Sequence, residues 1–228
     1  HGLLVDTEFH RGKQPDVCPS QSETRAEMPK LDIAGAPVRE MIADLVRRHV
    51  AITSTLAVFE AFDGAHPPLE QRFLDALAPE NALGYLAARA RARGGDDTPI
   101  MQAVRKEVEF ERAFVKAGGL LVAGADPTGN GGALAGFADQ RNIELLVEGG
   151  FTPAEAIQIA TSNGAKLLRQ QDHIGTIAAG KQADLVVIDG NPAARIADIR
   201  KIKLVFLDGA GYDPVKLLDS IKGAAGPH

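Results

Sequence analysis

The sequence predicts an α/β body followed by an antiparallel β tail. In the first part of the chain, segments with apolar residues at helical spacing each lead into a short run of apolar or β-branched residues. Such alternation favours a parallel sheet with crossover helices. In the last part, short apolar runs are separated by turns that contain Gly and Asp, which is typical of antiparallel strands.

The first predicted elements follow a long polar stretch. Residues 6–30 contain three prolines and few apolar side chains, so we expect a long loop there. Apolar residues then recur at helical spacing and predict a short amphipathic helix, at Val38, Met41, Ile42, Leu45 and Val46. Residues 49–56 are rich in β-branched side chains and predict a buried strand.

The second helix–strand unit has clearer boundaries. Thr98 supplies an N-cap, with Pro99 at the first helical position. The helix carries a mostly apolar stripe, formed by Val104, Val108, Glu111 and Val115. Two glycines at 118 and 119 end this helix, residues 120–124 predict a short apolar strand, and residues 125–132 predict a loop.

A third helix leads into the tail. Thr152 and Glu155 form a capping box that opens a helix extending to Leu168. Residues 174–177 and 183–188, joined by a turn, then predict a β-hairpin. A further strand is predicted at residues 205–207.

Composition excludes several classes of protein. The net charge of −5 argues against a protein that tracks nucleic-acid phosphates and against a basic membrane-surface protein. The single cysteine, Cys18, excludes an internal disulfide and a cysteine-rich zinc module. No apolar run approaches the roughly 20 residues that span a bilayer.

Asp126 is the strongest candidate for chemistry because it directly follows the strand predicted at 120–124. Ligands and catalytic groups gather at the carboxyl end of parallel strands. A carboxylate there can bind a metal ion or move a proton. The alternative is structural: Asp126 caps a turn whose backbone is set by Pro127.

The Gly-rich run from Gly124 to Gly132 invites comparison with phosphate-binding loops. Its spacing fits neither the Walker loop nor the dinucleotide fingerprint. Instead of a nucleotide site, we expect a flexible rim that contacts substrate, formed by Thr128, Gly129 and Asn130.

The six histidines form no pattern of a local metal site, so a zinc site would need residues that are distant in the sequence. His1 raises a separate alternative, because a terminal histidine can chelate copper through its amine and imidazole. The oxidative polysaccharide-cleaving enzymes that do so resemble disulfide-bearing sandwiches with exposed aromatic residues. This chain, with one Cys and no Trp, does not fit that description.

Several segments share an order with one known family. They are the His1-Gly2 step, a strand ending at residues 53–56, and the stretches 116–126, 146–157 and 174–187. Together they closely resemble the C-terminal half of the metal-dependent amidohydrolase superfamily, near its imidazolonepropionase-like and prolidase-like members. The stretch 117–190 is the specific part of this resemblance.

The resemblance implies both a fold and a site. The fold would be the C-terminal part of a (β/α)8 TIM-type barrel over residues 1–170, followed by strands of a small β-sandwich over residues 171–228. In that family, a histidine ending the sixth strand and an aspartate ending the eighth bind metal, and the aspartate takes the proton from the attacking water. His1 and Asp126 match these two positions. The implied cofactor is a divalent metal, with zinc expected.

The implied activity is hydrolysis of non-peptide or dipeptide-type C–N amide bonds by a metal-activated water. The substrate would be a small-molecule amide or a dipeptide, with no nucleic-acid or membrane partner, and a homo-oligomer is left open. A soluble, cytoplasmic protein is the default expectation for the compartment.

Two departures from the family lead us to expect a fragment. No His-x-His occurs, and the fourth- and fifth-strand ligands have no candidates; the chain also begins at His1 without an initiator Met. We expect it to be inactive without the missing N-terminal half of the barrel, and to expose apolar side chains at Val50, Ile52, Leu56 and residues 120–122. The alternative is a non-catalytic binding or scaffold chain that retains the tail of the family.

Overall fold

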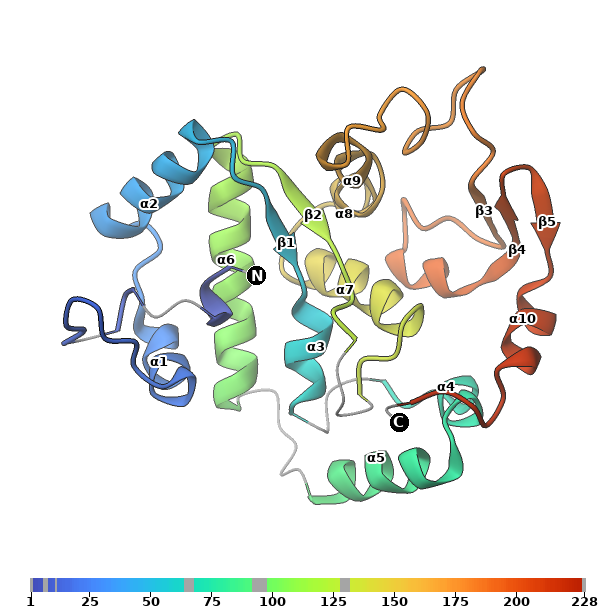
Figure 1. The fold of residues 1–228 in the computed structure, drawn as a ribbon, viewed down its shortest axis with the longest axis horizontal. Helices are drawn as coiled ribbons and strands as arrows, with labels where there is room; N and C mark the ends of the chain where they lie inside the picture. Colours follow the sequence, from blue (N-terminus) through green and yellow to red (C-terminus); the bar gives the residue numbers. More distant parts are fainter. Residues whose placement is uncertain are drawn as a thin grey trace.

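The computed structural model describes residues 2–5, 8–10, 12–63, 68–91, 98–127 and 132–226. Helices surround a two-stranded parallel sheet in one part of the molecule, and a three-stranded antiparallel sheet lies in the other (Figure 1). The mixed body and the antiparallel tail agree with the fold class that the sequence predicts.

The N-terminal region contains more helix than predicted. After the 3-10 turn η1 (Leu3–Val5), residues 6–30 include α1 (Gln21–Glu27) and the 3-10 turn η2 (Met28–Lys30), so the prediction of one long loop is wrong there. A capping box begins α1: the Glu23 amide donates to the Ser20 hydroxyl, and the Ser20 amide donates to the Glu23 carboxylate. The amphipathic helix is confirmed as α2 (Ala36–Arg47).

The parallel sheet pairs β1 (Ile52–Ser54) with β2 (Leu121–Ala123), so that Ile52 lies opposite Leu121 and Ser54 opposite Ala123. β1 is shorter than predicted because the chain turns directly into a helix at Leu56. The crossover between the strands consists of α3 (Leu56–Ala61), α4 (Gln71–Ala76), α5 (Pro79–Arg91) and α6 (Pro99–Lys116).

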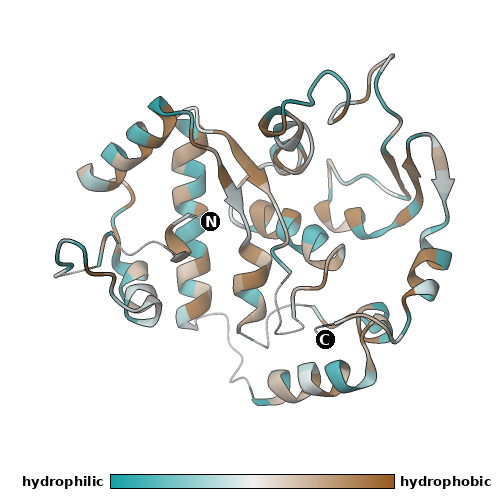
Figure 2. Cartoon of the chain, viewed as in Figure 1, coloured by the Kyte–Doolittle hydropathy of each residue, from teal (hydrophilic) through white to brown (hydrophobic). Residues whose placement is uncertain are grey.

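The apolar core lies around this sheet. Ile52, Leu56, Leu121 and Val122 are each at most 5% exposed. α6 and the following helix α7 (Phe137–Glu148) pack against β2, and α3 packs against both of these helices. The expectation that these residues form an exposed apolar face is therefore wrong. Of that set, Val50 is exposed, at 42%. Apolar residues are prominent along β2 (Figure 2).

The third predicted helix is divided into α8 (Pro153–Ala160) and α9 (Ser162–Leu167). Its capping box is confirmed, since the Glu155 amide donates to the Thr152 hydroxyl and the Thr152 amide donates to the Glu155 carboxylate. The break lies at Thr161, whose hydroxyl donates to the Ile157 carbonyl at 2.6 Å and so competes with helix continuation.

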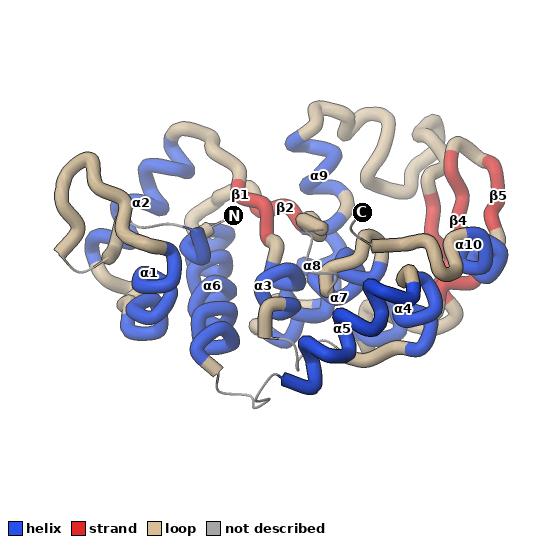
Figure 3. The backbone as a smooth tube through the Cα atoms, turned by 60° about the horizontal axis from the view of Figure 1, so that its bottom comes forward, coloured by secondary structure: helices blue, strands red, loops and turns tan. Residues whose placement is uncertain are grey.

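The tail sheet has the order β3-β4-β5, with strands Leu185–Ile188, Ile202–Leu207 and Ala210–Tyr212. β3 pairs with β4 and not with residues 174–177, which form bends and irregular chain, so the predicted hairpin is wrong. The 3-10 helix η3 (Ile196–Arg200) precedes β4, and α10 (Pro214–Ser220) follows β5. Figure 3 shows this sheet at the far side of α7 from β1 and β2.

A network of charged side chains joins the tail to the body. The Arg200 guanidinium, from η3, donates to the Glu144 carboxylate on α7 at 2.5 and 2.6 Å and also pairs with Glu70. On the same helix, Arg141 pairs with Glu60 of α3 at 2.7 Å. Because Glu60 and Glu144 are buried, their carboxylates depend on these arginines to offset the cost of losing water.

We expect Arg200→Gln to lower the free energy of unfolding by about 2 kcal/mol, since it removes a charged partner from the buried Glu144 carboxylate. Hydrogen exchange should also become faster in β4, which follows η3 directly. Urea denaturation and exchange mass spectrometry would measure both effects. Arg91→Gln, at the exposed end of α5, is the matched control. Equal stability and equal exchange for the two variants would contradict this role of Arg200.

Candidate site at the carboxyl ends of the parallel strands

The carboxyl ends of β1 and β2 lie at the same edge of the sheet, because the strands are parallel. One hydrogen bond closes this edge: the Gly124 amide donates to the Ser54 carbonyl at 3.0 Å. The chain then leads into α3 from β1 and into the loop before α7 from β2 (Figure 1). Side chains immediately after the two strands are therefore placed next to one another.

Asp126 lies two residues beyond Gly124 and is partly buried. Its backbone adopts the left-handed conformation, with φ of 44°. Non-glycine residues are uncommon there, and aspartate tolerates it better than most side chains. Pro127 follows, and Ala125 before it is buried. The Asp126 carboxylate is thus carried by a backbone of unusual geometry at the edge where the strands end.

Asn142 of α7 makes hydrogen bonds to the backbone at this edge. Its side-chain amide donates to the Ser54 carbonyl, and its side-chain oxygen accepts from the Ala57 amide, both at 3.2 Å. Asn142 is completely buried. It therefore holds the end of β1 and the first turn of α3 in a single arrangement, a role that no pattern in the sequence indicates.

Two buried glutamates of α6 lie close to the same strand end. The Ser54 hydroxyl donates to Glu111 at 3.1 Å, while Glu107, one turn earlier, accepts from the Leu4 amide at 2.9 Å. Burial raises the pKa of the Glu111 carboxyl well above its ordinary value, and the nearby Glu107 charge raises it further. The sequence places Glu111 on the apolar stripe of this helix, which is the signal that it lies in the core.

Gly2 packs directly against Glu107 of this pair. A Cβ atom at Gly2 would lie 2.0 Å from a Glu107 oxygen and 3.1 Å from the Phe110 ring. Only glycine allows the backbone to approach α6 this closely. The His-Gly step singled out in the sequence is thus followed by a segment that docks on α6.

The other sequence-predicted site residues lie outside the described part of the chain. These are His1 and the loop residues Thr128, Gly129 and Asn130. Within the described residues, no group of three or more His, Cys, Asp or Glu side chains is arranged to hold a metal ion. The resemblance implies two metal ligands, His1 and Asp126, and of these two only Asp126 lies among the described residues. No helix in the described ranges is long and apolar enough to cross a membrane.

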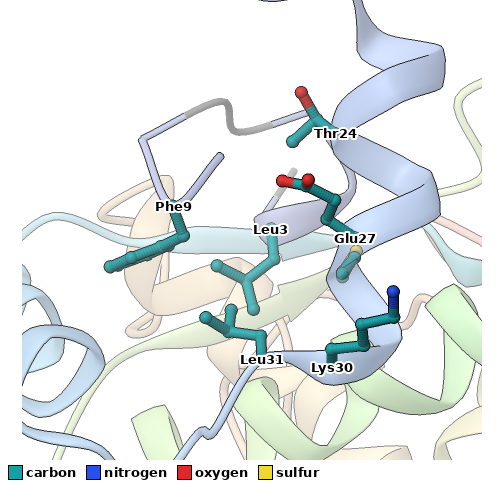
Figure 4. Close-up of a pocket in the computed structure, with 7 residues that line it drawn as sticks. Leu3, Phe9, Thr24, Glu27, Lys30 and Leu31 are labelled. Carbon is teal, nitrogen blue, oxygen red and sulfur yellow. The ribbon is translucent and has the colours of Figure 1, made fainter. Parts of the chain in front are cut away.

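A cavity of about 280 Å³ lies elsewhere, between η1, the segment around Phe9, and α1 with η2 (Figure 4). Leu3 and Leu31 form part of its wall, and the polar groups of Glu27 and Lys30 lie on the side of α1 and η2. None of its lining residues comes from β1, β2 or the segment of Asp126.

Comparison with known protein families finds a match to the middle and tail of the chain. The model of the amidohydrolase family matches residues 104–210, from α6 through β2 and the tail sheet to the start of β5. The resemblance to the amidohydrolase superfamily is therefore confirmed. Asp126 lies inside the matched range.

Curated relatives match shorter stretches. An imidazolonepropionase of Micrococcus luteus is 48% identical over 47 residues, which are 21% of this chain and 12% of that protein. Adenine deaminase 2 of Jannaschia sp. is 32% identical over 83 residues, or 36% of this chain and 13% of that protein. The chain thus spans well under a quarter of the length of these relatives.

Solved structures show the same fold over more of the chain. A bottromycin amidohydrolase matches with a TM-score of 0.56 and 22% identity, covering 85% of this chain and 44% of that one. A prolidase complexed with N-methylphosphonate-L-proline matches with a TM-score of 0.51 and 21% identity, covering 76% and 37%. These neighbours imply a TIM-barrel-like fold, of which the described residues contain two adjacent parallel strands.

The raised pKa of Glu111 predicts a pH dependence of stability. The folded chain holds the Glu111 proton more tightly than the unfolded chain does, because the pKa of this carboxyl in the unfolded chain is near 4.5. The free energy of unfolding should therefore fall as the pH rises above 4.5, by up to about 1.4 kcal/mol per pH unit while Glu111 remains protonated in the fold.

Glu111→Gln should remove this fall, because glutamine stays neutral and can still accept from Ser54. Glu109→Gln, on the exposed side of the same helix, should retain it. Urea denaturation between pH 4.5 and 8 would measure the slopes. A slope that is unchanged in Glu111→Gln would contradict the assignment.

Proposed function

From the likeness to the amidohydrolase superfamily, we propose that this chain is part of a metal-dependent hydrolase of C–N bonds and that Asp126 is its catalytic residue. The observation that carries the proposal is the position of Asp126. It follows a parallel strand at the carboxyl edge of the sheet, within the residues that the family model matches. Catalytic groups in barrels and open α/β sheets are found at this edge.

Asp126 can act as a general base and then as a general acid. Its carboxylate would take a proton from the attacking water as the water oxygen forms a bond to the carbonyl carbon. The same proton would pass to the nitrogen when the C–N bond breaks, which balances the hydrolysis of an amide to an acid and an amine. The backbone bond from Gly124 to Ser54, supported by Asn142, holds the strand ends from which Asp126 extends.

The described residues do not form a metal site by themselves. Protein zinc sites use three or four ligands, and Asp126 supplies one. We propose that zinc is held by Asp126 together with His1 and with further ligands from outside the described residues.

The proposed architecture follows from the two sheets. Residues 1–170 would form the C-terminal part of a barrel, because β1 and β2 are parallel and joined through helices. Residues 171–228 would form a β-sandwich tail around β3, β4 and β5. The solved neighbours are more than twice as long as the parts that match this chain. This supports the proposal that the chain is active only when the remaining barrel strands are present.

The proposed substrates are small amides and dipeptides. Support comes from the relatives, which include an imidazolonepropionase and, among solved structures, a prolidase. A panel of cyclic amides, Xaa-Pro dipeptides and aminopurines, assayed for release of acid, amino acid or ammonia, would separate these chemistries.

Asp126→Asn should lower hydrolysis of the best substrate in this panel by at least about 100-fold in the full-length protein, because asparagine cannot accept the proton of water. The melting temperature should stay close to that of the unchanged protein, since Asn also tolerates left-handed backbone. Asp172→Asn, at an exposed turn, is the matched control. Near-normal turnover by Asp126→Asn would overturn the assigned role.

Removal of metal provides a second test. Dialysis of the full-length protein against a chelator should abolish hydrolysis, and added Zn²⁺ should restore it. His1→Ala should lower the zinc content measured by elemental analysis, whereas His173→Ala should leave it unchanged. Full activity after chelation, or a zinc content that is insensitive to both His1→Ala and Asp126→Asn, would argue against this metal set.

A further inference from the structure

Residues 223–226, which follow α10, lie along the link between α4 and α5, and we call them the strap. The Ala225 amide donates to the Ala76 carbonyl, and the Ala225 carbonyl accepts from the Ala78 amide, both at 2.8 Å. This pair of bonds forms a short parallel β-bridge. In Figure 1 the strap, in red, runs back from α10 toward α4. It therefore connects the tail to helices of the crossover between β1 and β2.

Two further contacts attach the strap. The Gly223 amide donates to the Asp75 carbonyl of α4 at 2.8 Å. At the other end of the strap, Gly226 has φ of 132°, and a Cβ atom there would lie 2.2 Å from the side-chain nitrogen of Asn81 in α5. Only glycine allows so close an approach with this backbone geometry. The strap is thus fitted to both helices.

α4 and α5 form an apolar cluster that is separate from the core around β1 and β2. Its buried members come from the two helices and their link, and are Phe73, Leu77 and Tyr85. Leu134, near the end of the loop between β2 and α7, and Phe137, at the start of α7, pack against this cluster. The ring of Phe137 meets the ring of Phe73 edge to face, with 5.5 Å between their centres. The end of the loop that contains Asp126 therefore packs on the helices that the strap joins.

The loop between β2 and α7 is thus attached at both of its ends. At its start, the Gly124 amide donates to the Ser54 carbonyl, two residues before Asp126. At its end, Leu134 lies against the cluster, and its carbonyl accepts from the Ala138 amide of α7 at 2.8 Å. The first attachment belongs to the sheet. The second depends on α4 and α5, and so on the strap that joins them.

α4 and α5 lie toward the carboxyl edge of the sheet, since Figure 1 shows α5 on the side of the body toward which β1 and β2 run. We propose that the strap is a positioning element for the rim of the site, the part of the loop that the sequence predicts to contact substrate. The proposal rests on the function proposed above. Without the strap, α4 and α5 would hold Leu134 less firmly, while Asp126 would keep its connection to the sheet. Substrate binding should therefore depend on the strap more strongly than the chemical step does.

Hydrogen exchange of this chain tests the contact without any substrate. Ala225→Pro removes the amide that donates to Ala76, so exchange at residues 134–138 should become at least about tenfold faster. Ala179→Pro is the matched control, because it lies at the first central position of an exposed turn, where proline is favoured. Unchanged exchange at residues 134–138, or an equal increase in β1 and β2, would overturn the proposal.

A double variant tests the route from the strap to the loop. Leu134→Ala removes the contact of the loop with the cluster, and should by itself give a similar increase in exchange at residues 134–138. If the strap acts through this contact, adding Ala225→Pro to Leu134→Ala should increase exchange by less than about twofold more. Full additivity of the two effects would contradict the proposed route.

Steady-state kinetics of the full-length protein test the functional part. Ala225→Pro should raise KM for the best substrate at least about tenfold and change kcat by less than about threefold, whereas Ala179→Pro should change neither. A lower kcat with an unchanged KM would contradict a role in positioning the rim. Asp126→Asn separates the two proposals, because it should lower kcat and leave exchange at residues 134–138 unchanged. Normal turnover by Asp126→Asn would overturn the proposed function, while the exchange results would still decide the contact of the strap.

Discussion

The polar contacts of Asn142 connect the elements on which the remainder of the body depends. This one buried side chain joins the end of β1, the first turn of α3 and the middle of α7. Through the Ser54 carbonyl, which also accepts from Gly124, the contact extends to β2. Since the interior cannot replace these hydrogen bonds with water, the strand ends have one favourable arrangement. The backbone that leads to Asp126 therefore starts from a fixed point.

Charged side chains stabilise the same region from the other side of α7. Arg141 and Arg200 neutralise buried carboxylates that come from α3 and α7, and Arg200 belongs to the tail. A second anchor lies within the tail, where Asp198 accepts from the Asn191 amide and from Lys201 and Arg195. These bonds lower the pKa of Asp198 to about 2. The tail is thus held by directional polar contacts, while the larger apolar core of the described residues lies around β1 and β2.

The sequence predicts best what is decided locally. Thr98 and Thr152 begin helices as expected, because a cap depends on residues within one turn. The prediction of Asp126 as a site residue rests on a local signal too, a short apolar strand followed by a polar loop. The hairpin prediction is wrong because the pairing of β3 with β4 depends on packing between segments that are separated in the chain. In residues 6–30, the three prolines favour a loop, and this signal outweighed the Ser20–Glu23 capping box that begins α1.

The candidate site shows the same division. Nothing near Asn142 in the sequence distinguishes a buried amide from an exposed one on a helix surface. Glu111 could have been recognised, since it lies on the apolar stripe of α6, but Glu107 and Gly2 meet only through tertiary packing. The cavity beside α1 likewise combines Leu3, Phe9 and Glu27 from three segments, and no local pattern indicates it.

The most direct measurement of the proposed site is X-ray diffraction from crystals of the full-length protein at wavelengths on both sides of the zinc absorption edge. The proposed function predicts an anomalous peak about 2.0–2.2 Å from a carboxylate oxygen of Asp126, the usual zinc–oxygen distance. The peak should disappear in Asp126→Asn crystals or weaken strongly. A zinc peak that lies away from Asp126, or the absence of any peak in fully active, zinc-supplied crystals, would contradict the assignment.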